Sequence, residues 1–291
     1  MDQIGFVGLG KMGLPMALNL LKAGFSLSVV SRSRPPVERA LEMGGKEAPS
    51  SRALAIQTKT IITCLPDLEA LEAIYLGADG LFEGARPNQL FIDHSTISPK
   101  LARTLFEKAR QKGADFLDAP VSGGPEGAKA CSLSIMVGGE PSAFEKARPI
   151  LDVLGKHIVH FGPPGAGSMA KLINNMFVGI LNFAVAEAFF LAARSGLDAE
   201  TLYATLMRST AKSAMLERNF PLFQKEDFAP RFSMAHLLKD LRLLQEAASD
   251  IGFVPESLQP PLRAVTQAVE GGMGKIDISA VTMLLQKLNP R

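Results

Sequence analysis

The stretch Gln3–Asn19 reads QIGFVGLGKMGLPMALN and decides the fold of the first half of the chain. It opens with a strand-like apolar run, and an amphipathic, helix-like segment begins at Met12. Between the two stands the spacing G-x-G-x-x-G, formed by Gly8, Gly10 and Gly13. A strand, this glycine spacing and a helix, in that order, predict a loop that holds the pyrophosphate of a dinucleotide at the helix N-terminus.

Each glycine of the motif has a separate expected role. Gly8 permits the tight turn, Gly10 lets the backbone approach the pyrophosphate, and Gly13 lets the helix pack closely on the strand. The same spacing also occurs at ordinary glycine turns, so the interpretation depends on the elements around it. The residues that complete the expected cofactor loop are Leu9, Lys11 and Met12.

The pattern of expected secondary structure changes once, near Gly162. Before it, short β-rich runs alternate with helical patterns, which predicts a mostly parallel sheet with helices on both faces. After it, only long helical patterns follow. We therefore expect an α/β protein, with a Rossmann-type dinucleotide-binding domain at residues 1–162 and an all-α domain at residues 163–291. The expected strands are Gln3–Gly8, Leu27–Ser31, Thr60–Leu65, Leu90–Asp93, Asp115–Asp118, Leu133–Val137 and His157–Phe161.

Composition excludes several classes of protein. The 291 residues are 47% hydrophobic and 21% charged, which is typical of a globular chain with a sizeable core. Lys+Arg 31 against Asp+Glu 29 leaves a formal charge of +2, too near neutral to predict nucleic-acid binding. Cys64 and Cys131 are the only cysteines, and the histidines show no metal-ligand spacing, so neither a disulfide framework nor a metal site is expected.

One segment, Met176–Ala193, is long and apolar enough to resemble a membrane span. Asn182 and Glu187 lie inside it, which favours a helix buried by other protein over one exposed to lipid. A helix that is apolar nearly all round needs burial on every side, so we expect a homodimer or homotetramer. Because the first strand begins almost at the first residue, no presequence is expected and a cytoplasmic location is predicted.

The end of the second expected strand bears on the choice of cofactor. An acidic residue about 20 positions after the glycine motif usually accepts the ribose 2′-hydroxyl of NAD. Here the strand ends in Ser31-Arg32-Ser33-Arg34, and the first carboxylate after it is Glu38. Without a carboxylate to repel a 2′-phosphate, and with Arg32 able to pair with one, NADP(H) is expected over NAD(H). The alternative is that both arginines are solvated surface residues.

The loop after Asp115–Asp118 is rich in small residues, since Asp118–Pro125 reads DAPVSGGP. Exposed N–H groups and a serine hydroxyl in such a stretch can form a neutral nest for an anion such as a carboxylate. Ser122, Gly123 and Gly124 would form this nest. The simpler interpretation is a plain Gly-Pro turn.

Two more clusters lie in the helical half. Lys171 and Asn175 stand one turn apart on one face at the start of the long helix, close to the predicted domain boundary. A lysine beside apolar residues is a candidate general acid, although most lysines are only surface charge. Lys239 and Asp240 stand in another apolar helix, where the alternative is an exposed face.

Taken together, these motifs resemble the β-hydroxyacid dehydrogenase family over about residues 3–288. Gly8–Asn19, GLGKMGLPMALN, is similar to the family signature GxGxMGxxMAxN, which is far more specific than G-x-G-x-x-G. Asp118–Gly124 resembles the family's substrate loop, Gly165–Asn175 its catalytic segment, and Lys239–Leu241 its KDL segment.

The resemblance implies hydride transfer between NADP(H) and a small aldehyde that bears a carboxylate, giving the corresponding hydroxyacid. It makes Lys171 the acid/base, Asn175 a substrate-binding residue, and Ser122, Gly123 and Gly124 the holders of the carboxylate. Ser95-Thr96 and Leu65-Pro66 would line the nicotinamide side. The residues implied for the cofactor are Gly8, Leu9, Gly10, Lys11, Met12, Gly13, Ser31, Arg32, Leu65, Pro66, Thr96 and Lys239.

One departure from the family pattern and three alternatives remain. Cys131 stands where the family often has a glycine, in AxxGTL, which implies a modest change in that loop.

The alternatives are an NAD-linked 3-hydroxyisobutyrate dehydrogenase, an imine reductase and a non-catalytic nucleotide-binding regulator. Lys171 argues against an imine reductase, where the lysine position commonly differs. Its presence together with Asn175 and the Ser122–Gly124 loop argues against a regulator.

Overall fold

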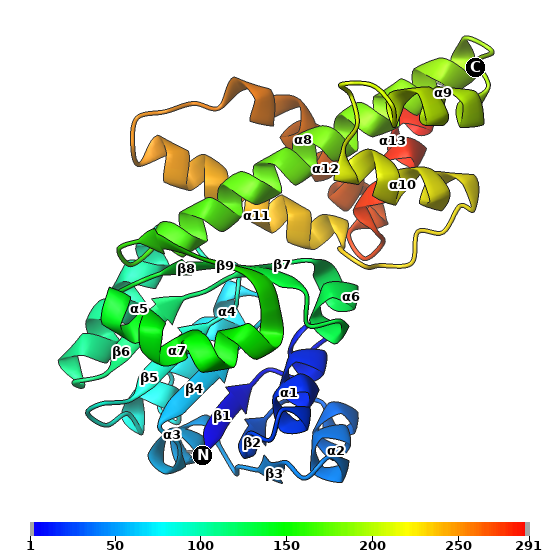
Figure 1. Ribbon diagram of the computed structural model, residues 1–291. Helices are drawn as coiled ribbons and strands as arrows, with labels where there is room; N and C mark the ends of the chain where they lie inside the picture. The colour runs from blue at the N-terminus through cyan, green and yellow to red at the C-terminus, as the bar shows by residue number, and fades with distance from the viewer. Residues whose placement is uncertain (1–2, 289–291) are drawn as a thin grey trace. The chain divides into compact units, whose positions relative to one another are not determined.

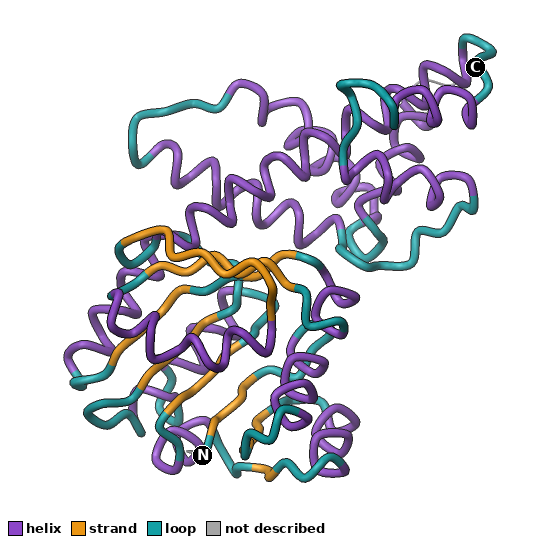
Figure 2. Tube along the Cα trace, viewed as in Figure 1, coloured by secondary structure: helices purple, strands orange, loops and turns teal. Residues whose placement is uncertain are grey.

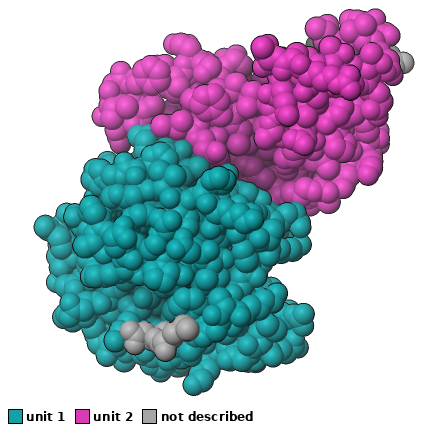
Figure 3. All heavy atoms as spheres, viewed as in Figure 1, with its two compact units in different colours: residues 1–171 teal, residues 172–291 magenta. Residues whose placement is uncertain are grey.

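The computed structural model describes residues 3–288, and the chain divides into two compact units, Met1–Lys171 and Leu172–Arg291 (Figure 3). The sequence changes from alternating strand and helix patterns to helical patterns at Gly162, which is the last residue of strand β9 (Gly155–Gly162). The division between the units falls further along the chain, inside helix α8 (Ala166–Arg194).

The first unit is built on one mostly parallel sheet, as the sequence predicts, and the described residues contribute nine strands to it (Figures 1 and 2). The strand order is β3-β2-β1-β4-β5-β6-β8-β7, and β9 pairs with β8. The first eight strands are β1 (Ile4–Val7), β2 (Leu27–Val30), β3 (Lys46–Glu47), β4 (Thr60–Thr63), β5 (Leu90–Asp93), β6 (Asp115–Asp118), β7 (Val121–Ser122) and β8 (Leu133–Gly138).

Helices pack on both faces of this sheet because neighbouring residues of a strand point to opposite sides. Phe6 and Ile62 belong to a core with α1, α2, α6 and α7, whereas Val7 and Ile61 belong to a second core with α3, α4 and α5. The helices are α1 (Gly13–Lys22), α2 (Arg34–Glu42), α3 (Ser51–Gln57), α4 (Leu68–Leu76), α5 (Pro99–Gln111), α6 (Gly124–Lys129) and α7 (Pro141–Leu154).

The strand order reverses between β1 and β4. From β1 the chain moves outward to β2 and β3, and it then returns to the other side of β1 with β4, β5 and β6. Val7 is level with Thr63, Thr63 with Asp93, and Asp93 with Asp118, so the carboxyl ends of these four strands form one edge. In open parallel sheets, ligands bind outside the carboxyl ends at such a reversal.

The second unit is helical, as the sequence predicts (Figure 1). By length and composition alone, α8 could also cross a membrane. Its Asn182 is fully buried and donates to the Ile278 carbonyl (3.0 Å), and it accepts from Asn219 (2.8 Å). Of the two polar residues that interrupt the apolar run, Asn182 is therefore satisfied by other parts of the chain, whereas Glu187 is exposed. The remaining helices are α9 (Ala199–Leu206), α10 (Ala214–Gln224), α11 (Met234–Ser249), α12 (Gln259–Ala268) and α13 (Val281–Leu288).

The backbone at Cys131 adopts a conformation that favours glycine. Its φ of 54° lies in the left-handed region, where a Cβ is strained and glycine is not. A glycine, which the resembling family often has at this place, would therefore suit the backbone that this chain adopts.

We predict that Cys131→Gly raises the free energy of unfolding by roughly 0.5–1 kcal/mol, which is the left-handed strain less the greater chain entropy of glycine. Urea denaturation measures the change. Cys131→Ala is the matched control, because it removes the thiol but keeps a Cβ at the same φ. An equal gain in both variants would show that the thiol, and not the backbone, is the source.

Candidate active site

The glycine loop between β1 and α1 has the shape that its motif predicts. Gly8 has a φ of 96°, and a Cβ there would collide with the Cys64 carbonyl oxygen. A Cβ on Gly13 would collide with the Gly8 carbonyl oxygen, so close packing of the helix against the strand requires this glycine. A Cβ on Gly10, in contrast, would meet no protein atom within 4 Å. The loop thus presents bare backbone to open space at Gly10, which fits the approach of a pyrophosphate.

The two arginines at the end of β2 differ in their surroundings. Arg34 is already paired, through Nε to Glu38 (3.2 Å) and through Nη1 to Glu47 (2.7 Å). Arg32 is exposed and makes no ion pair with any residue in 3–288. Ser31 accepts a hydrogen bond from the Leu9 N–H (3.3 Å), which ties the end of β2 to the glycine loop. Arg32 is therefore the guanidinium at this edge that remains available to an anion.

The loops that follow β4 and β5 are joined to each other. The Leu65 N–H donates to Ser95 Oγ (2.9 Å), and Ser95 Oγ donates to Asp93 Oδ1 (2.7 Å). Asp93 is fully buried, and this burial raises the pKa of its carboxyl to about 6. Pro66 and Thr96 are the next residues of the two loops, so the structure brings the predicted pairs Leu65-Pro66 and Ser95-Thr96 to one place.

His94 links the loop after β5 to the loop after β6. Its Nδ1 lies 2.6 Å from the Ala119 carbonyl oxygen, which can only accept, so Nδ1 carries the hydrogen. Burial lowers the pKa of His94 to about 4, so the ring is neutral at physiological pH. This histidine makes a structural contact between two loops of the site.

The predicted carboxylate nest adopts a backbone that only glycines take readily. Gly123 has a φ of 128° and Gly124 a φ of 63°, directly after Ser122 at the end of β7. A Cβ on Gly124 would meet nothing within 4 Å, so the loop is open there. Asn19, the last residue of the extended glycine signature, donates from α1 to the Ala128 carbonyl in α6 (2.7 Å). This bond joins α1 to α6, the helix that begins at Gly124, a role that the signature alone does not reveal.

The start of α8 is held by a carboxylate at the end of β6. Asp118 Oδ1 accepts from the Gly165 N–H (2.8 Å), and Oδ2 accepts from the Ser168 N–H (2.7 Å). A Cβ on Gly167 would collide with the carbonyl oxygens of Asp118 and Met136, so the helix begins in close contact with the sheet. Burial raises the pKa of Asp118. These contacts fix the segment on which Lys171 lies, and Lys171 itself is only 8% exposed.

Asn175 is fixed by a residue whose role the sequence analysis missed. Its Nδ2 donates to Asp240 Oδ2 (2.6 Å) in α11, and both side chains are buried. Asp240 Oδ1 also pairs with Lys239 Nζ (2.9 Å). Lys239, Asp240 and Asn175 therefore form one connected chain within the second unit, in which Asp240 and Asn175 are buried and Lys239 is partly exposed. A carboxylate inside an apolar helix was the signal that could have pointed to Asp240.

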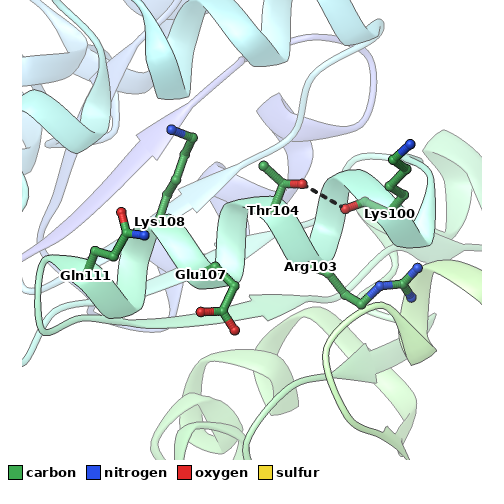
Figure 4. Close-up of a pocket in the computed structure, with 6 residues that line it drawn as sticks. All are labelled: Lys100, Arg103, Thr104, Glu107, Lys108 and Gln111. Atoms are coloured by element: carbon green, nitrogen blue, oxygen red, sulfur yellow. Dashed lines mark hydrogen bonds between the residues drawn. The ribbon is translucent and has the colours of Figure 1, made fainter.

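A surface hollow on α5 belongs to no part of this constellation (Figure 4). All of its lining residues come from that one helix, and Thr104 Oγ1 donates to the Lys100 carbonyl (3.1 Å). None of the predicted site residues lines it. Within residues 3–288, no group of His, Cys, Asp or Glu side chains could hold a metal ion.

Comparison with known proteins decides the family. Residues 3–162 match the NAD binding domain of 6-phosphogluconate dehydrogenase, and residues 165–285 match the NAD-binding domain described for NADP-dependent 3-hydroxyisobutyrate dehydrogenase. The chain belongs to the β-hydroxyacid dehydrogenase family. It is therefore an NAD(P)-dependent oxidoreductase, and the fold, the resemblance and the enzyme class predicted from sequence are confirmed.

Relatives of this β-hydroxyacid dehydrogenase span nearly its whole length. It is 40% identical to an NAD-dependent L-serine dehydrogenase of Pseudomonas aeruginosa, with 85% of this chain and 86% of the relative covered. It is 33% identical to 2-hydroxy-3-oxopropionate reductase of Escherichia coli, with 98% and 97% covered. The solved structure of Mycobacterium tuberculosis 3-hydroxyisobutyrate dehydrogenase with L-serine superimposes with a TM-score of 0.90 at 34% identity, covering 98% of this chain and 99% of that one.

The open space at Gly10 gives a direct test of the cofactor loop. We predict that Gly10→Ala leaves the free energy of unfolding unchanged, since the new Cβ meets no protein atom within 4 Å. The substitution should lower the affinity for NADPH at least about 10-fold, because the Cβ occupies the space that the pyrophosphate needs. Titration of NADPH fluorescence measures the affinity. Gly271→Ala is the matched control, because its Cβ also meets nothing within 4 Å and lies in the second unit. Unchanged NADPH affinity in Gly10→Ala would contradict the assignment.

Proposed function

We propose that this β-hydroxyacid dehydrogenase interconverts a small carboxylate-bearing aldehyde, either a semialdehyde or glyoxylate, with the corresponding hydroxyacid, using NADP(H). The observation that carries the proposal is Lys171, a buried lysine on a helix whose start is hydrogen-bonded to Asp118, the residue that precedes the substrate loop. A lysine ammonium can act as a general acid on a group that develops negative charge. A carbonyl oxygen during reduction is such a group.

In the direction of reduction, Lys171 as an ammonium stabilises the negative charge that develops on the carbonyl oxygen, and it donates the proton. In the direction of oxidation, the neutral lysine takes the proton of the hydroxyl group. A bound nicotinamide supplies or accepts the hydride. Ser122, Gly123 and Gly124 bind the carboxylate of the substrate, so that the carbonyl is oriented as well as bound.

Asn175 keeps hydrogen-bonding capacity for the substrate. One of its two amide hydrogens goes to Asp240, and its oxygen accepts from Asn174 Nδ2 (3.0 Å). Among the described residues, the second amide hydrogen and one lone pair of the oxygen have no further partner. Asp240 therefore orients the amide and leaves it able to bind a hydroxyl or carbonyl oxygen.

The role of Lys171 predicts a specific kinetic defect. Lys171→Ala should lower kcat about 100-fold or more, the usual scale for loss of a general acid, while the affinity for NADPH stays nearly intact. Steady-state kinetics and NADPH titration measure the two quantities. Lys112→Ala, which removes an exposed lysine at the end of α5, is the control for loss of charge. Turnover that survives in Lys171→Ala would refute the mechanism.

The preference for NADP over NAD rests on Arg32. Arg34 is occupied by two carboxylates, which leaves for a 2′-phosphate the guanidinium of Arg32, which has no ion pair within residues 3–288. The Pseudomonas aeruginosa relative is named NAD-dependent, so members of this family differ in this respect.

Arg32→Ala should therefore lower the ratio of kcat/KM for NADPH to that for NADH on the order of 10- to 100-fold, since a charge-assisted hydrogen bond is lost. Arg34→Ala is the matched control and should change the ratio little, because that guanidinium is held by Glu38 and Glu47. A ratio that stays the same in Arg32→Ala, or that falls equally in both variants, would contradict the assignment.

The substrate is best found with a kcat/KM panel of glyoxylate, succinic semialdehyde, tartronate semialdehyde and 3-hydroxyisobutyrate. L-serine joins the panel because one relative is named for it and one solved relative contains it. Consumption or formation of NADPH with at least one of these compounds supports the proposal. Tight NADPH binding without turnover of any of them supports the non-catalytic regulator instead.

We also propose a homodimer or homotetramer. Phe177 and Leu191 of α8 are 56% and 66% exposed in the single chain, which leaves apolar surface of this helix uncovered. Sedimentation velocity should therefore give a mass of two or four chains. A monomer at micromolar concentration would contradict this expectation.

A further inference from the structure

Four buried side chains form a hydrogen-bonded network beneath the loops that follow β4 and β5. They are Thr63 at the end of β4, Tyr75 of α4, Asp93 at the end of β5, and Ser95 just beyond it. We call them the Asp93 network. No more than 4% of any of these residues is exposed to solvent.

The hydrogen bonds of the Asp93 network converge on one oxygen. Thr63 Oγ1 donates to Asp93 Oδ1 (2.6 Å), and both the hydroxyl (2.7 Å) and the N–H (3.2 Å) of Ser95 donate to the same atom. Since the single hydroxyl hydrogen of Thr63 is used in this way, the Tyr75 hydroxyl donates to Thr63 Oγ1 (2.8 Å).

Ser95 extends the network to the loop after β4. Because its hydroxyl hydrogen goes to Asp93, its oxygen is left to accept, and it accepts from the Leu65 N–H (2.9 Å). Asp93 thus sets the orientation of Ser95, and Ser95 holds the backbone of Leu65. The two loops are connected through this one hydroxyl group.

A contribution to stability does not explain why this network is present. Within residues 3–288, Asp93 Oδ2 has no hydrogen-bond partner, although the side chain is fully buried. A buried carboxyl group with one unsatisfied oxygen stabilises a fold less than a well-packed apolar side chain of the same size. Its benefit lies in the geometry that it imposes on Ser95 and Leu65.

The position of these loops in the sheet indicates what they serve. The glycine loop and Arg32 follow β1 and β2, on the side of the strand reversal where the adenosine half of a dinucleotide binds. The other half of the cofactor then extends across the reversal to the ends of β4 and β5, where Leu65 and Ser95 lie.

We propose that Asp93 and Ser95 are positioning residues for the nicotinamide half of the cofactor: Asp93 acts through Ser95 to lock together the loops after β4 and β5. The inference rests on the proposed function, in that it needs bound NADP(H) or NAD(H) and hydride transfer. Neither residue takes part in the chemistry.

The test compares the whole cofactor with its adenosine half. Ser95→Ala should weaken NADPH binding and lower kcat, each about 10-fold, because the Leu65 N–H loses its acceptor and the loops lose their connection. The same variant should bind 2′,5′-ADP as tightly as the wild type does, since that compound lacks the nicotinamide half. If the wild type binds NADH more tightly than NADPH, NADH and ADP-ribose replace the pair. NADPH fluorescence measures the cofactor, and competition measures the half-cofactor.

Two further variants separate positioning from general loss of structure. Tyr75→Phe removes one buried hydrogen bond of the same network but leaves Asp93, Ser95 and Leu65 connected. It should lower stability and leave NADPH affinity and kcat unchanged. As a single substitution, Asp93→Asn should weaken NADPH binding. In the Ser95→Ala background it should have no further effect, because the effect of Asp93 passes through Ser95.

Three results would overturn the inference: equal losses of NADPH and 2′,5′-ADP affinity in Ser95→Ala, equal kinetic defects in Tyr75→Phe and Ser95→Ala, or additive effects of Asp93→Asn and Ser95→Ala. Failure of the proposed function has a different signature. In that case the wild type itself would bind NADPH without turning over any substrate of the panel.

Discussion

The carboxylate of Asp118 makes the contact on which the rest of the site depends. The first N–H groups of a helix have no partner within the helix, and a carboxylate satisfies them well because the helix dipole is positive at that end. Both oxygens of Asp118 serve the start of α8, and they do so from the end of a central strand. The segment that carries Lys171 is thus attached directly to the sheet.

The parallel sheet explains why separate parts of the chain serve one site. In a parallel sheet, the carboxyl ends of all strands meet at one edge, and here those of β1, β4, β5 and β6 are level. The end of β1 leads into the glycine loop, and the ends of β4 and β5 carry the Asp93 network. The end of β6 provides Asp118 and leads into the loop predicted to bind the substrate carboxylate. Each strand end therefore carries a different group of residues, and the register of the sheet places these groups at one edge.

The sequence predicts the sheet and the motif-bearing loops because both leave local patterns. Strand–helix alternation and the glycine spacing can be recognised within a few residues. The strands β3 and β7 and the helices α3 and α6 were not predicted, because elements of two to seven residues are too short to show a periodic pattern.

The supporting residues of the site could not be predicted for a different reason. Asp118, Asp240 and Asn19 act on partners that lie 47, 65 and 109 residues away along the chain. No local pattern reveals such a partner, because the contact exists only after the chain has folded. The glycines were predictable, since their backbone needs are visible in the residue type itself, and the role of Lys171 stays a prediction.

Deuterium transfer tests most directly whether this chain moves a hydride between a nicotinamide and a carboxylate-bearing carbonyl compound. NADPH that carries deuterium on one face of the nicotinamide C4 would be incubated with the best substrate of the panel, and the hydroxyacid would be analysed by mass spectrometry. We expect one deuterium on the carbinol carbon of the product from one face of the nicotinamide and none from the other. Product without deuterium from either face, or oxidation of NADPH without any hydroxyacid, would contradict it.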